Sequence, residues 1–500
     1  MRMKKIAVIG SGFAGISAAT TLAAEGFDVT VYEKNESAGG RARKFESNGF
    51  VFDMGPSWYW MPDVFEKYFN RFGKSVSDYY QLDRLSPSYR IFFNDKESWD
   101  IPSRLEDLYD FFEKEESGSS HQLKKFLEEA AYKYKVGIED LVYKPGLSIL
   151  ELMDTQLVKG VFKLHVLQSI SKYIRKYFKS PRLIQLLEFP VLFLGAAPSD
   201  TPALYSLMNY ADMALGTWYP KGGMNKIVEA MVALANEKGV KFEFNSTVQS
   251  LNMNSTKIKS ISINGRTEMV DHVVAGADYH HVEQQLLPEK FRKYKEGYWE
   301  NRKLAPSSLI FYLGVNKRID NLRHHNLFFD EDFTLHTKEI YENPSWPTNP
   351  LFYVCCPSKT DSSVAPEGGE NLFILIPVAS GLEDEEATRE KYFQLVINRI
   401  EKLTDQQIAQ HIVYKRSYAH RDFIDNYNSY KGNAYGLANT IGQTANLKPS
   451  IINNKVSNLF YTGQLTVPGP GVPPSLISGQ VVAQELMKRE RRKSAKNFNT

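Results

Sequence analysis

A glycine-rich turn near the start of the sequence restricts the fold more than any other feature. Residues 5–9 form an apolar run, and Gly10, Gly12 and Gly15 follow with the spacing GxGxxG ahead of a helical pattern. A second apolar run then ends at the acidic residue Glu33. A strand, a glycine turn, a helix and a strand that ends in an acid form the βαβ unit that binds dinucleotides. We therefore predict an α/β protein with a Rossmann-like nucleotide-binding domain.

Each residue of this turn has a physical reason to be there. Gly10 permits the tight turn, Gly12 lets the backbone approach a pyrophosphate, and Gly15 lets the helix pack closely on the strand. The unpaired N–H groups at the start of the helix, at Phe13 and Ala14, and the positive end of the helix dipole then hold the phosphates. The alternative is a glycine turn that binds no ligand.

The acid at the end of the second strand predicts which nucleotide is bound. Glu33 is placed to accept hydrogen bonds from a ribose, and its charge disfavours a 2′-phosphate. Lys34 follows it directly and belongs to the same predicted cofactor site.

Composition excludes several classes of protein. A chain of 500 residues is long for one domain, and 42% hydrophobic and 24% charged residues are typical of a globular protein. The formal net charge of +3 predicts no nucleic-acid partner. The only two cysteines are adjacent, Cys355 and Cys356, which fits a reducing, cytoplasmic compartment better than a disulfide. No apolar run reaches the roughly 18 residues of a membrane-spanning helix.

Two further motifs distinguish FAD from NAD. Gly39, Gly40 and Arg41 follow the predicted ribose acid, and the stretch GFVFDMGPSWYW comes next. A second glycine pair with an arginine resembles the extension of the GR2 class of FAD enzymes, where it lies along the phosphates and the ribityl chain. The guanidinium fork of an arginine can pair with phosphate oxygens. The alternative is a set of surface arginines beside a flexible turn.

The C-terminal end repeats the arrangement of strand, glycine turn and helix. Residues 458–462 predict the strand, Gly463 the turn, and residues 475–488 the helix, with a proline- and glycine-rich lead-in at 468–474. In the flavoproteins that this resembles, the turn and the helix start face the flavin, and the helix dipole favours negative charge there. Many relatives have an acid after the turn glycine where this chain has Gln464, so that contact is left open.

Most of the chain resembles the bacterial carotenoid desaturases, and the bacterial-type phytoene desaturases in particular. The resemblance rests on residues 49–69, 219–231, 238–251, 273–288, 431–440 and 461–479. It implies non-covalently bound FAD, an apolar polyene substrate, oxygen or quinone as electron acceptor, and peripheral contact with the inner face of the cell membrane. It also implies that Val248 contacts the adenine. The remaining predicted cofactor residues are Gly55, Pro56, Ser57, Gly471, Val472 and Pro473.

We therefore expect a desaturase that introduces conjugated double bonds into a C40 carotenoid, phytoene towards lycopene first. The alternative within the family is a 3,4-desaturase type that acts on a later, hydroxylated or cyclised carotenoid. A flavin amine oxidase would share the fold and the terminal motifs, but the cysteines lie too early for its usual covalent link to FAD. A non-enzymatic lipid-escort protein would not retain the flavin motifs.

The expected architecture is a discontinuous GR2-type FAD-binding domain, a mixed-sheet substrate domain and a helical membrane-facing region. We assign residues 1–85, 220–285 and 445–490 to the first domain, and 86–140 with 286–444 to the second. Residues 141–219 form the third region. Within it, residues 155–179 combine apolar residues at helical spacing with lysines and arginines, as in a helix that lies on a membrane. The alternative is a surface helix that packs on the core.

The sequence names no catalytic side chain and no metal ligands. The histidines, including His324 and His325, have no metal-binding spacing with acidic residues. Trp58 is expected either to line the substrate channel or to be a buried structural residue. In this kind of enzyme the cofactor carries the chemistry, and the protein supplies shape and electrostatics.

Overall fold

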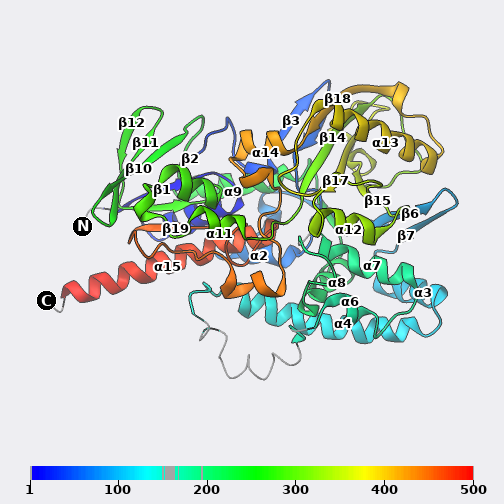
Figure 1. The fold of residues 1–500 in the computed structure, drawn as a ribbon, viewed down its shortest axis with the longest axis horizontal. Coiled ribbons are helices and arrows are strands. Elements are labelled where there is room, and N and C mark those ends of the chain that lie inside the picture. Colours follow the sequence, from blue (N-terminus) through cyan, green and yellow to red (C-terminus); the bar gives the residue numbers. More distant parts are fainter. Residues whose placement is uncertain (1–2, 149–150, 152–163, 167, 193–194, 499–500) are drawn as a thin grey trace.

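The computed structural model describes residues 3–148, 151, 164–166, 168–192 and 195–498 (Figure 1). A parallel sheet and a larger mixed sheet lie at opposite ends of the long axis, and a group of helices lies below the larger sheet (Figure 1). The predicted α/β class with a Rossmann-like unit and a mixed second sheet is confirmed.

The first sheet gathers strands that are far apart in the sequence. Its order is β19-β13-β1-β2-β9, and every neighbouring pair is parallel. The strands are β1 (Lys5–Ile9), β2 (Asp28–Tyr32), β9 (Lys241–Glu243), β13 (His272–Ala275) and β19 (Leu459–Tyr461). Because all five run in one direction, their carboxyl ends meet at one edge, which is where ligands bind in open α/β sheets.

Three helices pack on or beside this sheet: α1 (Phe13–Ala24), α9 (Asn225–Glu237) and α15 (Val472–Phe498). The two helices from opposite ends of the chain, α1 and α15, cross closely because Gly479 has no side chain. A Cβ atom on Gly479 would lie 2.3 Å from the carbonyl oxygen of Ala14. The N-termini of α1 and α15 are thereby held side by side at the carboxyl edge of the sheet.

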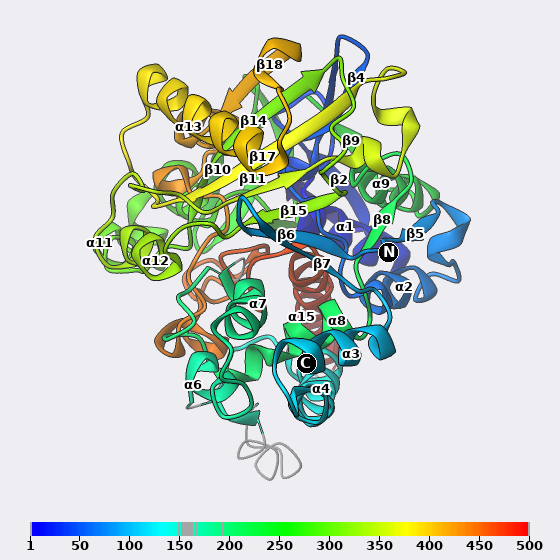
Figure 2. The same cartoon turned by 90° about the vertical axis from the view of Figure 1, so that its right-hand side faces the viewer.

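The second sheet has seven strands in the order β18-β14-β17-β16-β15-β6-β7. Its neighbours are antiparallel except for β15 and β6. The helix α13 (Glu386–Thr404) covers one face (Figure 2). The strands are β6 (Tyr89–Asn94), β7 (Glu97–Ile101), β14 (Ser307–Val315), β15 (His325–Phe328), β16 (Phe352–Cys355), β17 (Glu370–Val378) and β18 (Ile412–Tyr418).

Smaller elements complete the two sheet regions. The strands β10 (Val248–Asn254), β11 (Lys257–Ile263) and β12 (Arg266–Met269) form a three-stranded antiparallel sheet. Two-stranded pairs join β3 (Lys44–Ser47) to β4 (Phe50–Asp53), and β5 (Leu82–Arg84) to β8 (Trp218–Pro220). Short helices are α2 (Pro62–Asn70), α10 (Tyr279–His281), α11 (Glu296–Glu300), α12 (Phe333–Tyr341) and α14 (His420–Tyr427).

The helical layer contains α3 (Leu105–Glu115), α4 (Ser119–Lys135), α6 (Ile170–Ile174), α7 (Pro181–Leu192) and α8 (Leu207–Met213) (Figure 2). Over the part of the chain that the structure describes, no helix has the length and apolarity needed to cross a membrane.

The segment predicted as one amphipathic helix, 155–179, differs from the prediction where it can be compared. Residues 155–163 and 167 lie outside the described residues. In the remainder, helix α6 spans only five residues, and His165 has a φ of 50°, which a right-handed helix does not accommodate. Ile170, Ile174 and Phe178 are buried in the core, so this part uses its apolar residues for internal packing.

Candidate functional site

One large cleft opens at the carboxyl edge of the parallel sheet. Its walls come from the ends of β1, β2, β13 and β19, the start of α15, and one face of the seven-stranded sheet. The space empty of protein atoms is about 2330 Å³, including the open mouth. The lining joins the glycine turns at the edge of the parallel sheet to an apolar wall on the larger sheet, so a dinucleotide at one end would leave the other end for a second ligand.

The start of helix α1 is open towards this cleft. Gly12 is the N-cap residue, has φ −72° and ψ 174°, and makes no side-chain capping bond. A Cβ atom built on Gly12 would meet no protein atom within 4 Å, and the residue lines the cleft. The first N–H groups of the helix are therefore accessible to an anion.

Glu33 follows β2 and is held rigidly at the cleft wall. One carboxylate oxygen accepts bonds from Ser11 N and Ser11 Oγ at 2.9 and 2.8 Å. The other accepts from Asn35 N and Nδ2 at 2.9 and 2.8 Å. Glu33 is only 4% exposed, and these bonds fix its carboxylate while it lines the cleft. A carboxylate fixed in this way suits the hydroxyls of a ribose.

Arg41 lines the cleft, and the hydrogen bonds of its guanidinium group are incomplete. Its Nη2 donates to Ser429 Oγ at 3.1 Å and to Asn433 O at 3.3 Å, whereas its buried Nε has no partner among the described residues. Burial lowers the pKa of Arg41 and raises the pKa of Asp278, and each of these charges partly offsets the shift of the other. A phosphate beside Arg41 would supply the missing acceptor and a counter-charge.

The C-terminal turn faces the same space. Gly463 has a φ of 109° and Gly471 a φ of 110°, so both occupy the left-handed region that favours glycine. In the orientation that satisfies both ends of its amide, Gln464 accepts from Arg41 Nη2 and donates to Ala434 O, each at 3.2 Å. The residue that replaces an acid in the flavoprotein pattern is thus bonded to the arginine.

The structure brings together the cofactor residues chosen from the sequence, with one exception. The residues that line the cleft are Gly10, Gly12, Phe13, Ala14, Glu33, Lys34, Gly39, Gly40, Arg41, Gly55, Pro56, Ser57, Val248, Gly463, Gln464, Gly471, Val472 and Pro473. Gly15 does not line it. A Cβ atom on Gly15 would lie 2.0 Å from the carbonyl oxygen of Gly10, so Gly15 permits the close packing of helix on strand.

The other half of the cleft, which we call the apolar half, lies against the seven-stranded sheet. Ile310, Leu375 and Tyr353 are register partners across β14, β17 and β16, and therefore form one row on one face. Trp58 lies over this row, with its ring centroid 5.5 Å from that of Tyr353. The wall is completed by Trp60, Met61, Met208 and Tyr435.

Charge is confined to the nucleotide end of the cleft. The acidic, basic and histidine side chains among its described lining are Glu33, Lys34, Arg41, Asp278 and His281, which follow β2 or β13 in the chain. Tyrosine and serine hydroxyls are the polar side chains of the apolar half. This half suits a long apolar molecule that is recognised by shape.

Sequence reasoning missed several lining residues. Asp278 and the α14 residues Phe423, Asn426 and Tyr427 line the cleft and were not singled out from the sequence. Arg41 lies over the Tyr427 ring at 5.0 Å, a contact that spans most of the chain. The stretch 431–440 was part of the family resemblance and lies just after α14. It is the sequence feature closest to α14 that could have indicated a part of the cleft there.

The fold and the cleft define a dinucleotide-binding oxidoreductase of the FAD type. The family model described as flavin containing amine oxidoreductase matches residues 13–487, so the chain belongs to this family. It is 39% identical to a carotenoid 3,4-desaturase of Haloarcula japonica over 97% of this chain and 98% of that one. It is 31% identical to a zeta-carotene-forming phytoene desaturase of Myxococcus xanthus over 97% and 94%. The predicted membership of the carotenoid desaturase family is confirmed.

Solved structures agree at the level of the fold. An oxidoreductase from Methanosarcina mazei superposes with a TM-score of 0.65 at 14% identity, covering 96% of this chain and all of that one.

Proposed function

We propose that the protein is an FAD-dependent carotenoid desaturase that introduces conjugated double bonds into a C40 polyene. The observation that carries the proposal is the junction of two unlike halves in one cleft. A nucleotide half with a free helix start and a buried arginine opens into the apolar half, which has no charged side chain among its described residues. The two desaturase relatives support the same reaction.

Different residues of the cleft would bind the cofactor and orient the substrate. Bound FAD supplies the acceptor for the hydride that leaves the substrate. The start of α1 and Arg41 would hold the phosphates of FAD, Glu33 would hold a ribose, and the start of α15 with Gly471 would lie towards the flavin. The row of Ile310, Leu375 and Tyr353, with Trp58 above it, orients the polyene and excludes water.

No charged acid or base is needed beside the substrate for this chemistry. The polar groups of the apolar half are the hydroxyls of Ser57, Ser308, Tyr353 and Tyr435. We propose that shape positions the polyene and that its hydride passes to bound FAD. The proton released from the neighbouring carbon passes by way of these hydroxyls to water at the open mouth of the cleft, and no carboxylate or imidazole of the lining takes it.

Sequence identity to the relatives favours a 3,4-desaturase, which acts on a later carotenoid, over a phytoene desaturase. The chain is 39% identical to the carotenoid 3,4-desaturase and 31% identical to the phytoene desaturase, over nearly the same length. We therefore place the 3,4-desaturase type first and the conversion of phytoene towards lycopene second. Oxygen and a quinone remain the two proposed electron acceptors.

Expression in two host strains tests which substrate the protein uses. One host accumulates colourless phytoene and the other accumulates coloured lycopene, and pigments are extracted from each. A 3,4-desaturase lengthens the conjugated system of the coloured carotenoid and leaves phytoene colourless. A phytoene desaturase colours the first host. If a soluble, flavin-loaded protein changes neither pigment, both substrates are excluded, and hosts that accumulate a hydroxylated and a cyclised carotenoid complete the test. No new pigment in any of the four hosts contradicts the carotenoid proposal.

We also propose peripheral contact with the inner face of the cell membrane, because an apolar substrate is stored in a bilayer. Lys172, Arg175, Lys176 and Lys179 are exposed and supply cations for anionic headgroups. The full protein should co-sediment with anionic liposomes at low salt, and added salt should release it. Equal recovery with neutral liposomes, or no binding at low salt, would contradict this contact.

A further inference from the structure

A second group of chemically active side chains lies behind the wall of the cleft. His324, His325 and Cys355 are all buried, and one ligand atom of each lies within 4.8 Å of one from each of the others. His325 and Cys355 are direct register partners on the antiparallel strands β15 and β16. The backbone N–H of Cys356 donates to His324 O at 2.7 Å, which fixes the loop end that carries His324.

Both imidazoles are oriented by hydroxyl groups. His324 Nδ1 lies 2.9 Å from Thr360 Oγ1, and His325 Nδ1 lies 2.6 Å from Tyr353 Oη. The two Nε2 atoms are buried and have no hydrogen-bond partner within the described chain. Metal-binding histidines usually donate the N–H of one ring nitrogen to a carboxylate, a backbone carbonyl or water, and bind the metal with the other. Here a hydroxyl oxygen takes the place of that acceptor for each ring.

We propose that His324, His325 and Cys355 form a binding site for a zinc-class divalent cation. Two imidazoles and one thiolate are the ligands that zinc prefers, at about 2.0–2.1 Å for nitrogen and about 2.3 Å for sulfur. In a tetrahedral site these bond lengths separate the ligand atoms by about 3.3–3.7 Å. The ligand atoms of the three side chains lie within 4.8 Å of one another, so bound zinc would draw them together by at most about 1.5 Å, with a water as the fourth ligand.

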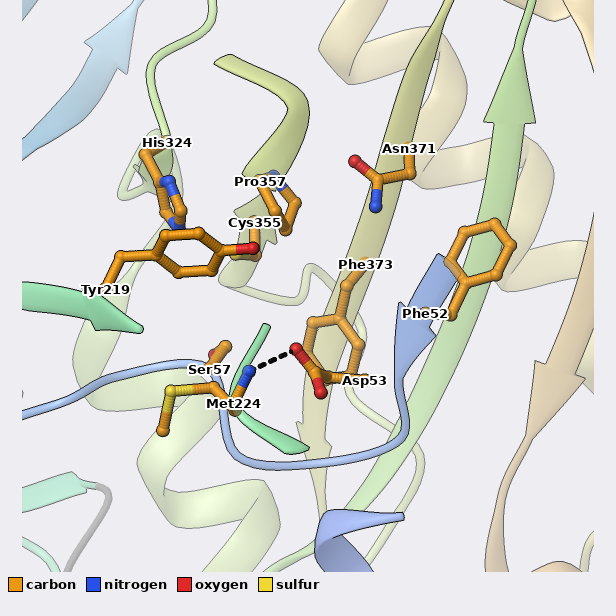
Figure 3. Close-up of a pocket in the computed structure, with 10 residues that line it drawn as sticks. All are labelled: Phe52, Asp53, Ser57, Tyr219, Met224, His324, Cys355, Pro357, Asn371 and Phe373. Atoms are coloured by element: carbon orange, nitrogen blue, oxygen red, sulfur yellow. Dashed lines mark hydrogen bonds between the residues drawn. The ribbon is translucent and has the colours of Figure 1, made fainter. Parts of the chain in front are cut away.

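A small cavity lies beside the cluster. His324 and Cys355 line it together with Tyr219 and Asp53 (Figure 3). The Tyr219 hydroxyl points towards Cys355 in this view. Asp53 is held by Met224 N and Asn225 N at 2.7 and 2.8 Å.

Charge balances when the cation binds. Cys355 gives up its thiol proton to solvent, the thiolate bonds to the cation, and no electron is transferred. One thiolate and the Asp53 carboxylate then neutralise a divalent cation in this buried place.

The cluster is coupled to the cleft through two side chains. The Trp58 ring stacks on the His325 ring with centroids 4.1 Å apart and planes at 11°. Tyr353 lines the cleft and bonds to His325. A cation at this point would therefore fix the wall that orients the polyene. Sequence spacing predicted no metal site, but spacing speaks only to ligands close in the chain, and these come from two strands.

The test uses the full-length, FAD-loaded protein, freed of metal with a chelator and kept reduced. Zinc content is measured by plasma mass spectrometry after one equivalent is added and the protein desalted. Cobalt(II) is titrated separately, because a cobalt–thiolate bond gives an intense near-ultraviolet band. The variants are Cys355→Ser and His324→Ala. The matched control is Cys356→Ser, a neighbouring buried thiol that instead donates to Glu370 Oε2 at 2.5 Å.

The expected result is about one zinc per chain with a Kd below ~1 μM, together with the cobalt–thiolate band. Both are lost in Cys355→Ser and retained in Cys356→Ser. Thr360→Val, which removes only the hydroxyl beside His324, should weaken zinc about 10–100-fold while the flavin spectrum stays unchanged. A Kd weaker than ~1 μM in the parent protein, or equal binding by Cys355→Ser, overturns the site.

Discussion

Replacing Gly12 with valine should weaken FAD binding and leave the stability of the FAD-free protein nearly unchanged. Gly12 has φ −72° and ψ 174°, an ordinary extended conformation that valine adopts without strain. A Cβ atom there meets no protein atom within 4 Å, yet it projects into the cleft at the start of α1. The added methyl groups therefore occupy the approach of the phosphates and not the protein core.

The size of the effect follows from the bonds that are lost. A hydrogen bond to a charged group contributes about 1.5–3 kcal/mol. If the side chain displaces two phosphate bonds at the helix start, FAD binding weakens by about 3–6 kcal/mol, or roughly 100–20,000-fold. The free energy of unfolding of the FAD-free protein changes by less than about 1 kcal/mol, because a half-buried N-cap glycine is replaced without a clash.

The assay is a fluorimetric titration of FAD into the FAD-free protein, with chemical unfolding of the same preparations. Gly297→Val is the matched control, since Gly297 is exposed in α11 and a Cβ atom there also meets nothing within 4 Å. The control should bind FAD normally. Undiminished FAD affinity in Gly12→Val, or loss of several kcal/mol of stability without FAD, would refute the reasoning.

Three further outcomes are expected. Gly15→Ala should destabilise the FAD-free protein by about 1–3 kcal/mol in chemical unfolding, because its Cβ would lie 2.0 Å from Gly10 O; an unchanged midpoint would contradict this. Arg41→Lys should weaken FAD about 10–100-fold in the same titration, because lysine lacks the Nε–H and the planar fork, and equal affinity would exclude the phosphate role. Burial raises the pKa of Asp212 from 3.8 to about 7, so the folded protein holds this proton more tightly and stability is lost as pH rises between these values. In the parent protein the free energy of unfolding should fall by on the order of 3 kcal/mol between pH 5 and pH 8, and Asp212→Asn should remove this fall. The same pH dependence of the free energy of unfolding in both proteins would contradict the prediction.

The local pattern predicted the elements whose signals lie close together in the chain. The apolar run at 5–9 is β1, and the glycine turn leads into α1 as expected, because turn, helix and strand signals are adjacent. The C-terminal helix begins at Val472, within the proline-rich lead-in, and not at 475. Proline is compatible with the first turn of a helix, where its missing N–H has no intrahelical partner.

Elements that depend on distant partners were predicted less well. The stretch 239–248 is divided between two sheets, because Asn245 has a φ of 51° and turns the chain out of the parallel sheet. β9 remains in that sheet, whereas Val248 begins β10 in another. The sequence of a single apolar stretch does not indicate that its two ends will pair in different sheets.

The same limit applies to the site. The phosphate side was recognisable because its glycines follow a fixed spacing, whereas the apolar half is a row of residues aligned by strand register across β14, β17 and β16. The pairing of His325 with Cys355 has the same origin. Register between distant strands is set by the packed fold and has no local signature.

Anaerobic mixing of the purified, FAD-loaded protein with a carotenoid tests the central claim most directly. Lycopene in liposomes and putrescine in solution are supplied separately, and the visible absorbance band of the oxidised flavin is followed. The account predicts that the band bleaches with the carotenoid and the extracted pigment gains conjugation, while the amine leaves the flavin oxidised. Bleaching by the amine, with lycopene and phytoene both inert, would contradict it.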